Sequence, residues 1–147
     1  MAAPTPRLRP ATAADLDFLW ALHVASMKPY VEQVYGWDDA DQRAMYEHDF
    51  AHAKTQIVEV DGRPAGRLEL RAHDDAVWLG NIQLTPERQN QGLGSAMIRA
   101  VMADAFAAGL PVRLRVFRIN PARRLYERLG FSQTRETDTH IYMQALP

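Results

Sequence analysis

Hydrophobic side chains recur in two spacings along this chain, and the spacings predict which segments form helices and which form strands. Thr12 and Asp15 resemble the capping box that starts a helix, with Asp in place of the usual Glu or Gln. Apolar or aromatic positions then repeat every three or four residues, at Leu16, Leu19, Trp20, His23, Val24 and Met27. We expect Pro29 to bend or end this helix. The aromatic segment 30–37 is expected to be a bent connection into a second helix over about residues 38–51.

Shorter β-type runs predict strands around these helices. A first strand surrounds Leu8, and runs over residues 56–60 and 65–71 flank a turn at 61–64 that contains Asp61-Gly62, a strong hairpin signal. A third consecutive strand is predicted over residues 76–84. The rest of the chain predicts a helix over 94–108, a strand over 111–119, a short helix over 122–129, and a closing hairpin with strands over 131–136 and 139–144.

The order of these elements predicts an α+β fold with a mixed sheet. Strands that follow one another across tight turns must pair antiparallel. The strands over 76–84 and 111–119 are joined by a helix, so this crossover should make them parallel neighbours. The chain has 147 residues and shows no repeat, low-complexity tract or linker, and we therefore expect one domain over residues 1–147.

Composition excludes several kinds of chemistry. The chain has no cysteine, which rules out disulfides, thiolate zinc sites, iron–sulfur clusters and a cysteine nucleophile. No apolar run approaches the ~18 residues that a membrane helix requires. Residues 1–10 lack the apolar core of a signal peptide. A cytoplasmic protein without a membrane partner is the expectation.

The formal net charge of −1 hides an asymmetry between the two parts of the chain. Residues 1–80 carry 8 Lys and Arg against 13 Asp and Glu, whereas residues 81–147 carry 9 against 5. Such a division suits two ligands of opposite charge, but it also arises from ordinary solvated surfaces. Six arginines lie between residues 113 and 128. Only Phe117 and Tyr126 in that range are aromatic, too few for the interleaved aromatic residues of an RNA-binding surface, so no nucleic-acid partner is expected.

The segment from Thr85 to Ser95 is the most informative part of the sequence. It leaves a predicted strand and opens a predicted helix, and Gly92 and Gly94 allow its backbone amides to face one concavity. A helix N-terminus at that place favours anionic oxygens, so the segment predicts diphosphate binding through the backbone. No P-loop string is present, and the dinucleotide fingerprint fails because Met97 and Leu114 occupy its third glycine and its acidic position.

Two motifs make the chain resemble the GNAT superfamily of N-acetyltransferases. Gln89, Gly92 and Gly94 fit the Gln/Arg-x-x-Gly-x-Gly/Ala form of that family's acetyl-CoA pyrophosphate loop. The segment 120–131, Asn-Pro-Ala-Arg-Arg-Leu-Tyr-Glu-Arg-Leu-Gly-Phe, is similar to a second family motif, with one residue fewer between Asn and Tyr. The predicted topology is similar to the GNAT fold over essentially the whole chain. The resemblance implies a mostly antiparallel sheet with one splayed parallel pair and helices on both faces.

The resemblance also implies a cosubstrate and residues that bind it. Acetyl-CoA would enter between the two parallel strands, and the amine would attack it directly, without a covalent enzyme intermediate. The implied cofactor-binding residues are Ile82, Leu84, Gln89, Asn90, Gln91, Gly92, Leu93, Gly94, Ser95 and Asn120. Asn120 is also suited to cap the short helix before Pro121. The six arginines are explained by the phosphates of this cosubstrate.

Tyr126 matches the tyrosine that serves this family as a general acid, and it is the predicted catalytic residue. Core packing of an aromatic side chain is the alternative for Tyr126. No base stands on the strand before the glycine loop, where some family members place a carboxylate. Candidates elsewhere are Glu69, Glu32 and His140, and deprotonation through water is equally open.

The amine acceptor is expected to contact the aromatic segment that follows the first helix. Tyr30, Glu32 and Trp37, together with His140 on the last hairpin, are the candidate acceptor-binding residues. An aromatic corner between two helices is an alternative explanation for this segment. The acceptor can be a small molecule, a peptide or a protein, and a homodimer is compatible with the family.

The alternatives concern a metal site and a non-catalytic role. His48 and His52 have a metal-ligand spacing on one helical face, but Asp49 is shorter than the Glu of a metalloprotease motif and no third ligand is evident, so no metal is expected. The alternative function is a non-catalytic module with the same fold that senses acetyl-CoA. The missing strand carboxylate favours the sensor, whereas Tyr126 favours the enzyme.

Overall fold

The computed structural model describes residues 5–52 and 54–147, and it contains a mixed seven-stranded sheet in that range. The strands are β1 (Arg7–Pro10), β2 (Thr55–Val60), β3 (Arg63–Ala72), β4 (Val77–Leu84), β5 (Val112–Phe117), β6 (Ser132–Glu136) and β7 (His140–Ala145). The α-helices of the described residues are α1 (Leu16–Tyr35), α2 (Asp39–His52), α3 (Leu93–Ala107) and α4 (Arg123–Arg128). Short 3-10 turns precede α1 at Ala13–Asp15 and α3 at Pro86–Arg88. All predicted strands and helices are present, with bounds shifted by a few residues.

The predicted parallel pair is confirmed. The strand order is β1-β2-β3-β4-β5-β7-β6, and β4 pairs with β5 in parallel register, with Val77 opposite Val112 and Trp78 opposite Arg113. Helix α3 connects these two strands, and a helical crossover returns the chain in the same direction. The other pairings are antiparallel. The α+β fold class predicted from the element order is therefore confirmed.

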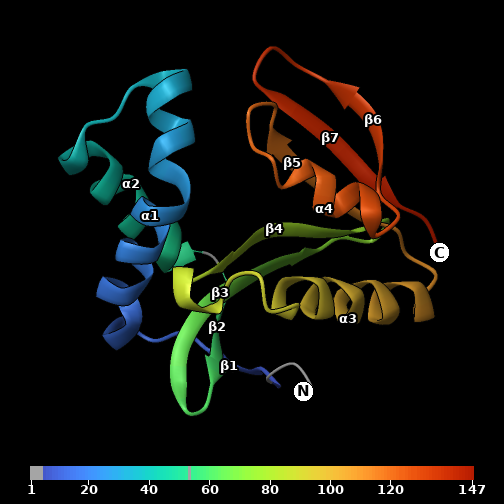
Figure 1. Cartoon of the computed structure of the whole chain (residues 1–147), viewed down its shortest axis with the longest axis horizontal. Helices are drawn as coiled ribbons and strands as arrows, with labels where there is room; N and C mark the ends of the chain where they lie inside the picture. The colour runs from blue at the N-terminus through green and yellow to red at the C-terminus, as the bar shows by residue number, and fades with distance from the viewer. Residues whose placement is uncertain (1–4, 53) are drawn as a thin grey trace. The chain divides into compact units, whose positions relative to one another are not determined.

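The chain divides into two compact units that are described here one at a time. The first contains the residues up to Glu69 together with Asn81–Leu93, and the second contains Leu70–Gly80 and Gly94–Pro147. In the first unit β1, β2 and the start of β3 lie side by side, as Figure 1 shows. Its core is formed by Leu19, Tyr46 and Ile57, which bring α1, α2 and β2 together.

Helix α1 does not stop at Pro29. It continues to Tyr35, so the prediction of a bent connection over residues 30–37 is wrong for all but its last two residues. A proline inside a helix removes one backbone hydrogen bond but does not forbid the helix from continuing. The helix ends where Gly36 adopts φ 78°, a left-handed conformation that glycine tolerates, and the Gly36 N–H donates to the Glu32 carbonyl.

The hairpin between β2 and β3 is tighter than the four-residue turn that we predicted. Asp61 and Gly62 both have positive φ, 54° and 75°, which is the two-residue turn that matches strand twist. The register then shifts after Val58, since Val58 faces Gly66 while Glu59 faces Pro64. Gly66 lies so close to β4 that a Cβ atom there would stand 2.1 Å from the Gln83 carbonyl oxygen. Glycine is therefore required at this position.

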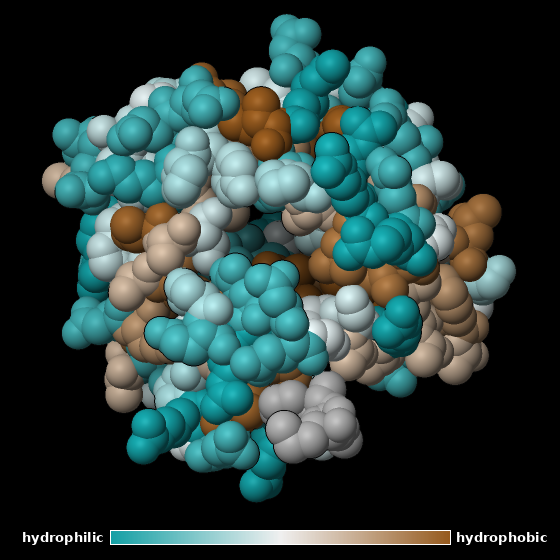
Figure 2. All heavy atoms as spheres, viewed as in Figure 1, coloured by the Kyte–Doolittle hydropathy of each residue, from teal (hydrophilic) through white to brown (hydrophobic). Residues whose placement is uncertain are grey.

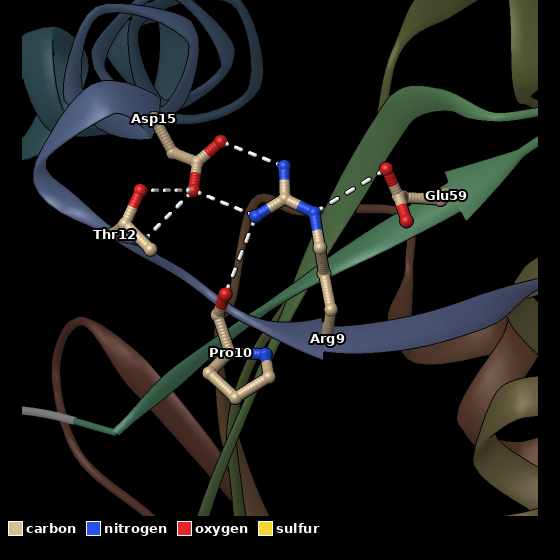
Figure 3. Close-up of polar contacts among 5 residues, drawn as sticks. All are labelled: Arg9, Pro10, Thr12, Asp15 and Glu59. Atoms are coloured by element: carbon tan, nitrogen blue, oxygen red, sulfur yellow. Dashed lines mark hydrogen bonds and ion pairs between the residues drawn. The ribbon is translucent and has the colours of Figure 1, made fainter.

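A polar network fixes the start of α1 to the edge strand β1 (Figure 3). Arg9 donates two hydrogen bonds of 2.8 Å to the Asp15 carboxylate and forms an ion pair with Glu59 at 3.3 Å. The Thr12 backbone N–H also donates to Asp15, at 2.8 Å, which confirms the predicted capping arrangement. These contacts, above all the Arg9 hydrogen bonds, lower the pKa of Asp15 to about 2.

In the second unit β5, β7 and β6 form a three-stranded segment (Figure 1). Alternate residues of β7 are buried, namely Ile141, Met143 and Ala145, which is the period of a strand with one face on a core. Every residue of β6 is exposed. Strand β6 therefore contributes backbone pairing at the sheet edge and little to the core.

Hydrophilic residues cover most of the face in Figure 2, with hydrophobic residues scattered between them. Among the described residues the large exposed hydrophobic ones are scattered: Leu8 on β1, Tyr35 on α1, Met45 on α2, Ile119 in the turn after β5 and Leu146 after β7. Within the described residues, no helix has both the length and the apolar character needed to cross a bilayer.

Candidate functional site

The glycine-containing loop leaves the end of β4 and leads into α3. Side chains brace it against the main chain on both sides, since Gln89 Nε2 donates to the Leu84 carbonyl at 3.1 Å and Gln91 Nε2 donates to the Glu87 carbonyl at 2.9 Å. Asn90 and Gly92 both have left-handed φ values, 61° and 80°. Residues of alternating hand turn successive backbone N–H groups toward one side, which makes a concavity for an anion.

The far end of this loop is held by packing. Leu93, the first residue of α3, is 1% exposed and packs with Val60, Ala65 and Leu84. No atom lies within 4 Å of the position that a Gly92 Cβ would occupy, so that side of the loop is open. A fixed, open loop at the N-terminus of a 15-residue helix can receive an anionic group.

The first unit thus brings together seven of the ten predicted cofactor-binding residues. They are Ile82 and Leu84 near the end of β4 and Gln89 to Leu93 in the loop. Gly94 and Ser95 follow directly in the first turn of α3 and belong to the second unit, as does Asn120. Asn120 Oδ1 accepts the Ala122 N–H at 2.9 Å and so makes a turn before α4, but the N-cap of that helix is Ala122, and the prediction that Asn120 caps it is wrong.

Tyr126 lies in the middle of α4. Its ring meets Phe131 edge-on, with centroids 5.8 Å apart. Burial raises the pKa of Tyr126 to about 12. Its hydroxyl has no hydrogen-bond partner among the described residues. A tyrosine in this state holds its proton at neutral pH and has that proton available to donate.

The candidate acceptor residues are distributed over both units. Tyr30 and Glu32 lie on α1, and Trp37 lies between α1 and α2. Trp37 stacks on Trp20 with centroids 6.1 Å apart, and the Lys28 ammonium lies 5.7 Å from the Trp37 ring. Trp37 therefore packs against another aromatic ring of the first unit, and one of the protein's own cations already lies near it.

His140 lies in the second unit, at the start of β7. Its ring stacks on Phe117 at 4.4 Å, and its Nδ1 is 2.7 Å from the Thr139 hydroxyl. Burial lowers the pKa of His140, and Arg115 lowers it further. The imidazole is consequently neutral at pH 7.

Sequence reasoning missed a group of buried polar residues in the first unit. Arg67 and Glu69 alternate with leucines in β3, a pattern that normally indicates a solvated face, yet they are 5% and 4% exposed. Arg67 donates to the Tyr46 hydroxyl at 2.6 Å and to Glu69 at 3.3 Å. The available signal was two opposite charges two positions apart on β3, followed by a strand, β4, that carries the two amides Asn81 and Gln83.

His23 also belongs to this region, although its spacing indicated only a helix face. Its ring lies 4.8 Å from that of Tyr46, and its Nδ1 is buried without a hydrogen-bond partner. Burial, aided by the Arg67 charge, lowers the pKa of His23 to about 4. The side chain of His52 lies outside the described residues, so the spacing of His48 and His52 is not tested.

Comparisons with known proteins decide the family. The model of the acetyltransferase (GNAT) family matches residues 17–131. The chain belongs to the GNAT acetyltransferase family. The motifs at Gln89 to Gly94 and Asn120 to Phe131 fall inside the matched range, and the predicted resemblance is confirmed. GNAT proteins are acyl-CoA-dependent acetyltransferases, and this is the class of enzyme to which the chain belongs.

Solved structures show the same GNAT fold. The PaiA N-acetyltransferase of Thermoplasma acidophilum, solved in complex with coenzyme A, has a TM-score of 0.77 at 16% identity, over 97% of this chain and 99% of that one. An acetyltransferase of Thermus thermophilus has a TM-score of 0.74 at 18% identity over 100% of both chains. The ribosomal-protein-S18-alanine N-acetyltransferase of Escherichia coli has a TM-score of 0.66 at 23% identity, over 97% and 94%. No curated protein matches the sequence.

Proposed function

We propose that this GNAT enzyme transfers the acetyl group of acetyl-CoA to a primary amine by direct nucleophilic attack. The observation that carries the proposal is the braced loop from Gln89 to Leu93, with left-handed Asn90 and Gly92 at the N-terminus of α3. Such a loop suits the pyrophosphate of a coenzyme A derivative. The coenzyme A bound to the Thermoplasma PaiA protein supports the same choice of cosubstrate.

The cosubstrate would be held mainly by main-chain groups. We assign the pyrophosphate to the loop and the first turn of α3, the pantetheine to the main chain of Ile82 and Leu84, and a further contact with the cosubstrate to Asn120. The second unit carries 9 basic against 6 acidic residues, which favours a polyanionic ligand. We also propose that residues 1–147 form one GNAT domain, because strands of both units belong to one sheet.

Tyr126 is the proposed general acid. A coenzyme A thiolate has a pKa near ~8.5 and leaves more readily when it receives a proton. The Tyr126 hydroxyl, with its pKa raised to about 12 by burial, is fully protonated at the pH of the reaction. In this proposal it gives its proton to the sulfur as the C–S bond breaks and recovers one from water.

The acceptor is a primary amine in this proposal, with Tyr30, Glu32, Trp37 and His140 as its contacts. The first unit carries 8 basic against 12 acidic residues, which favours a cation such as an ammonium group. His140 is neutral at pH 7 and does not repel that cation. An alkyl ammonium has a pKa near ~10.4, so it must lose a proton before it attacks.

The test combines a binding measurement with a turnover measurement. Saturating acetyl-CoA should raise the melting temperature of the full chain, and free coenzyme A should appear when amines, amino-acid amides, peptides or polyamines are added. A melting temperature that does not change would contradict the proposal that acetyl-CoA is the cosubstrate. Binding of acetyl-CoA without coenzyme A release from any amine would instead indicate the sensing module.

A further inference from the structure

A continuous chain of polar contacts crosses the first unit from α2 to β4. Arg67 Nη1 donates to the Tyr46 hydroxyl at 2.6 Å, and Arg67 Nη2 donates to Glu69 Oε2 at 3.3 Å. The same Oε2 accepts a hydrogen bond of 2.7 Å from Asn81 Nδ2. Three of these four residues are buried, whereas Asn81 is half-buried. This series of hydrogen bonds thus leads from three buried residues to Asn81, which is partly exposed.

The strand pairing explains why Asn81 meets Glu69. The Thr85 N–H donates to the Ala65 carbonyl at 2.8 Å, which fixes β3 and β4 as antiparallel neighbours. Moving back four residues on β4 and forward four on β3 places Asn81 opposite Glu69. Residues directly opposite each other in an antiparallel pair project from the same face, close enough to bond.

Glu69 determines which end of the Asn81 amide faces outward. A carboxylate accepts hydrogen bonds and donates none, so the amide nitrogen must point to Glu69. Asn81 Oδ1 then points away from Glu69, and it makes no hydrogen bond within the described part of the chain. Donation to a carboxylate also polarises the amide, which makes Oδ1 a stronger acceptor.

Gln83 shows that this arrangement is specific to Asn81. Gln83 lies two residues along the same strand and is 6% exposed, and both polar atoms of its amide are enclosed without a partner. Asn81 Oδ1 is not among the enclosed unpartnered atoms of the described residues. Of the two amides on β4, only that of Asn81 combines a fixed orientation with an oxygen that a ligand can contact.

We propose that Asn81 is a catalytic residue whose Oδ1 accepts a hydrogen bond from the attacking amine, and that Glu69 and Arg67 are its positioning residues. This inference rests on the proposed function. Asn81 immediately precedes Ile82, whose main chain we assign to the cosubstrate. The ligand recognised is an amine nitrogen that keeps at least one N–H while its lone pair attacks.

The step balances without a basic side chain. The ammonium first loses a proton to water, and the lone pair of the neutral amine forms the N–C bond with the thioester carbon while the carbonyl π pair moves to oxygen. The nitrogen becomes positive, and Asn81 Oδ1 stabilises its N–H before the second proton leaves to water. The carbonyl re-forms as the C–S bond breaks, and the sulfur takes a proton from Tyr126. One proton is released overall.

The experiment uses the full chain with acetyl-CoA and whichever of spermidine, alanine amide and an alanine-initiated peptide the wild type acetylates fastest. Asn81→Ala should lower kcat/KM for that amine about 30- to 100-fold and leave the KM for acetyl-CoA within twofold. Glu69→Gln should lower kcat/KM about three- to tenfold, because a glutamine can face Asn81 with either end of its amide. In the Asn81→Ala background, Glu69→Gln should cause no further loss.

The control is Gln56→Ala, another half-buried strand amide of the same unit, which should change kcat/KM less than twofold. If Glu69 were itself the base, Glu69→Gln would remove the acidic limb of the pH profile and would act equally in both backgrounds. Either result, or a kcat/KM that Asn81→Ala leaves unchanged, overturns the inference.

If Asn81→Ala fails to melt cooperatively, Asn81→Ser replaces it, with the same expected loss of kcat/KM. If the wild type acetylates no amine, the proposed function fails first.

Discussion

The ion pair between Arg9 and Asp15 gives a quantitative prediction for stability. Asp15 is 9% exposed at its side chain and accepts two 2.8 Å hydrogen bonds from Arg9 and one from the Thr12 backbone (Figure 3). The fall of its pKa from 3.8 to about 2 corresponds to about 2.4 kcal/mol at 1.36 kcal/mol per tenfold change. The Arg9 side chain is 34% exposed, so solvent screens part of the interaction free energy between Arg9 and Asp15. We therefore expect Asp15→Asn to lower the free energy of unfolding by about 1–2 kcal/mol at pH 7.

The pH dependence has a definite sign. The folded pKa lies below the unfolded one, so the ionised carboxylate stabilises the fold above about pH 4, and this contribution disappears as the pH falls toward 2. Urea unfolding of wild type and Asp15→Asn should therefore differ by about 1–2 kcal/mol at pH 7 and much less at pH 2.5. Other carboxylates titrate in both proteins and cancel in the difference.

A neighbouring aspartate provides the matched control. Asp17 also pairs with an arginine, Arg43, at 3.1 Å, but its side chain is 95% exposed, and Asp17→Asn should cost less than about 0.5 kcal/mol. A double-mutant cycle of Arg9→Met with Asp15→Asn should return a coupling free energy of about 1–2 kcal/mol. The reasoning is refuted if Asp15→Asn matches Asp17→Asn at pH 7, or if its cost is the same at pH 2.5.

Three further predictions concern the site. Tyr126→Phe should lower kcat about 100-fold without changing the affinity for acetyl-CoA, because it removes the proton donor, and unchanged turnover would exclude that role. Gly92→Asp should weaken acetyl-CoA binding at least ~100-fold by titration calorimetry, because it puts a charge against the phosphates, and Gly92→Ala controls for backbone strain at φ 80°. Gly66→Ala should lower the free energy of unfolding by about 3 kcal/mol, because its Cβ would lie 2.1 Å from the Gln83 carbonyl oxygen, and a cost below about 1 kcal/mol would contradict this packing.

Local patterns predicted the elements well because their causes lie within a few residues of each other. Asp61 and Gly62 specify a two-residue turn by their tolerance of positive φ, and the hairpin formed there. Pro29 was misleading because the cost of one missing helical hydrogen bond is small enough for the rest of a long helix to outweigh it. Gly36, a few residues later, was the true end of α1.

The sequence predicted the loop at residues 89–94 but not the contacts among the buried polar side chains of the first unit. Gln89, Gly92 and Gly94 lie within six residues of one another, so their spacing alone predicts a phosphate-binding loop. Arg67, Glu69, Tyr46 and Asn81 come from three different elements, and only the spacing of Arg67 and Glu69 on one strand could be read from the sequence. Arg67 and Glu69 alternate with leucines in β3, which indicated that their face of the strand is solvated. The alternation of a strand is the same whether or not a helix covers that face, so the sequence could not show that these two residues are buried.

The sequence by itself determined the element order, the parallel crossover, the glycine-containing loop before α3 and the family, since each depends on residues close together in the chain. The tertiary structure alone decided that Glu69 is buried, that it is paired with Arg67, and that it bonds to Asn81 across the strands. Strand register and the packing of α1 and α2 over the sheet are cooperative properties of distant segments. For that reason the residue proposed to contact the amine, Asn81, lies on the strand where the sequence offers no base.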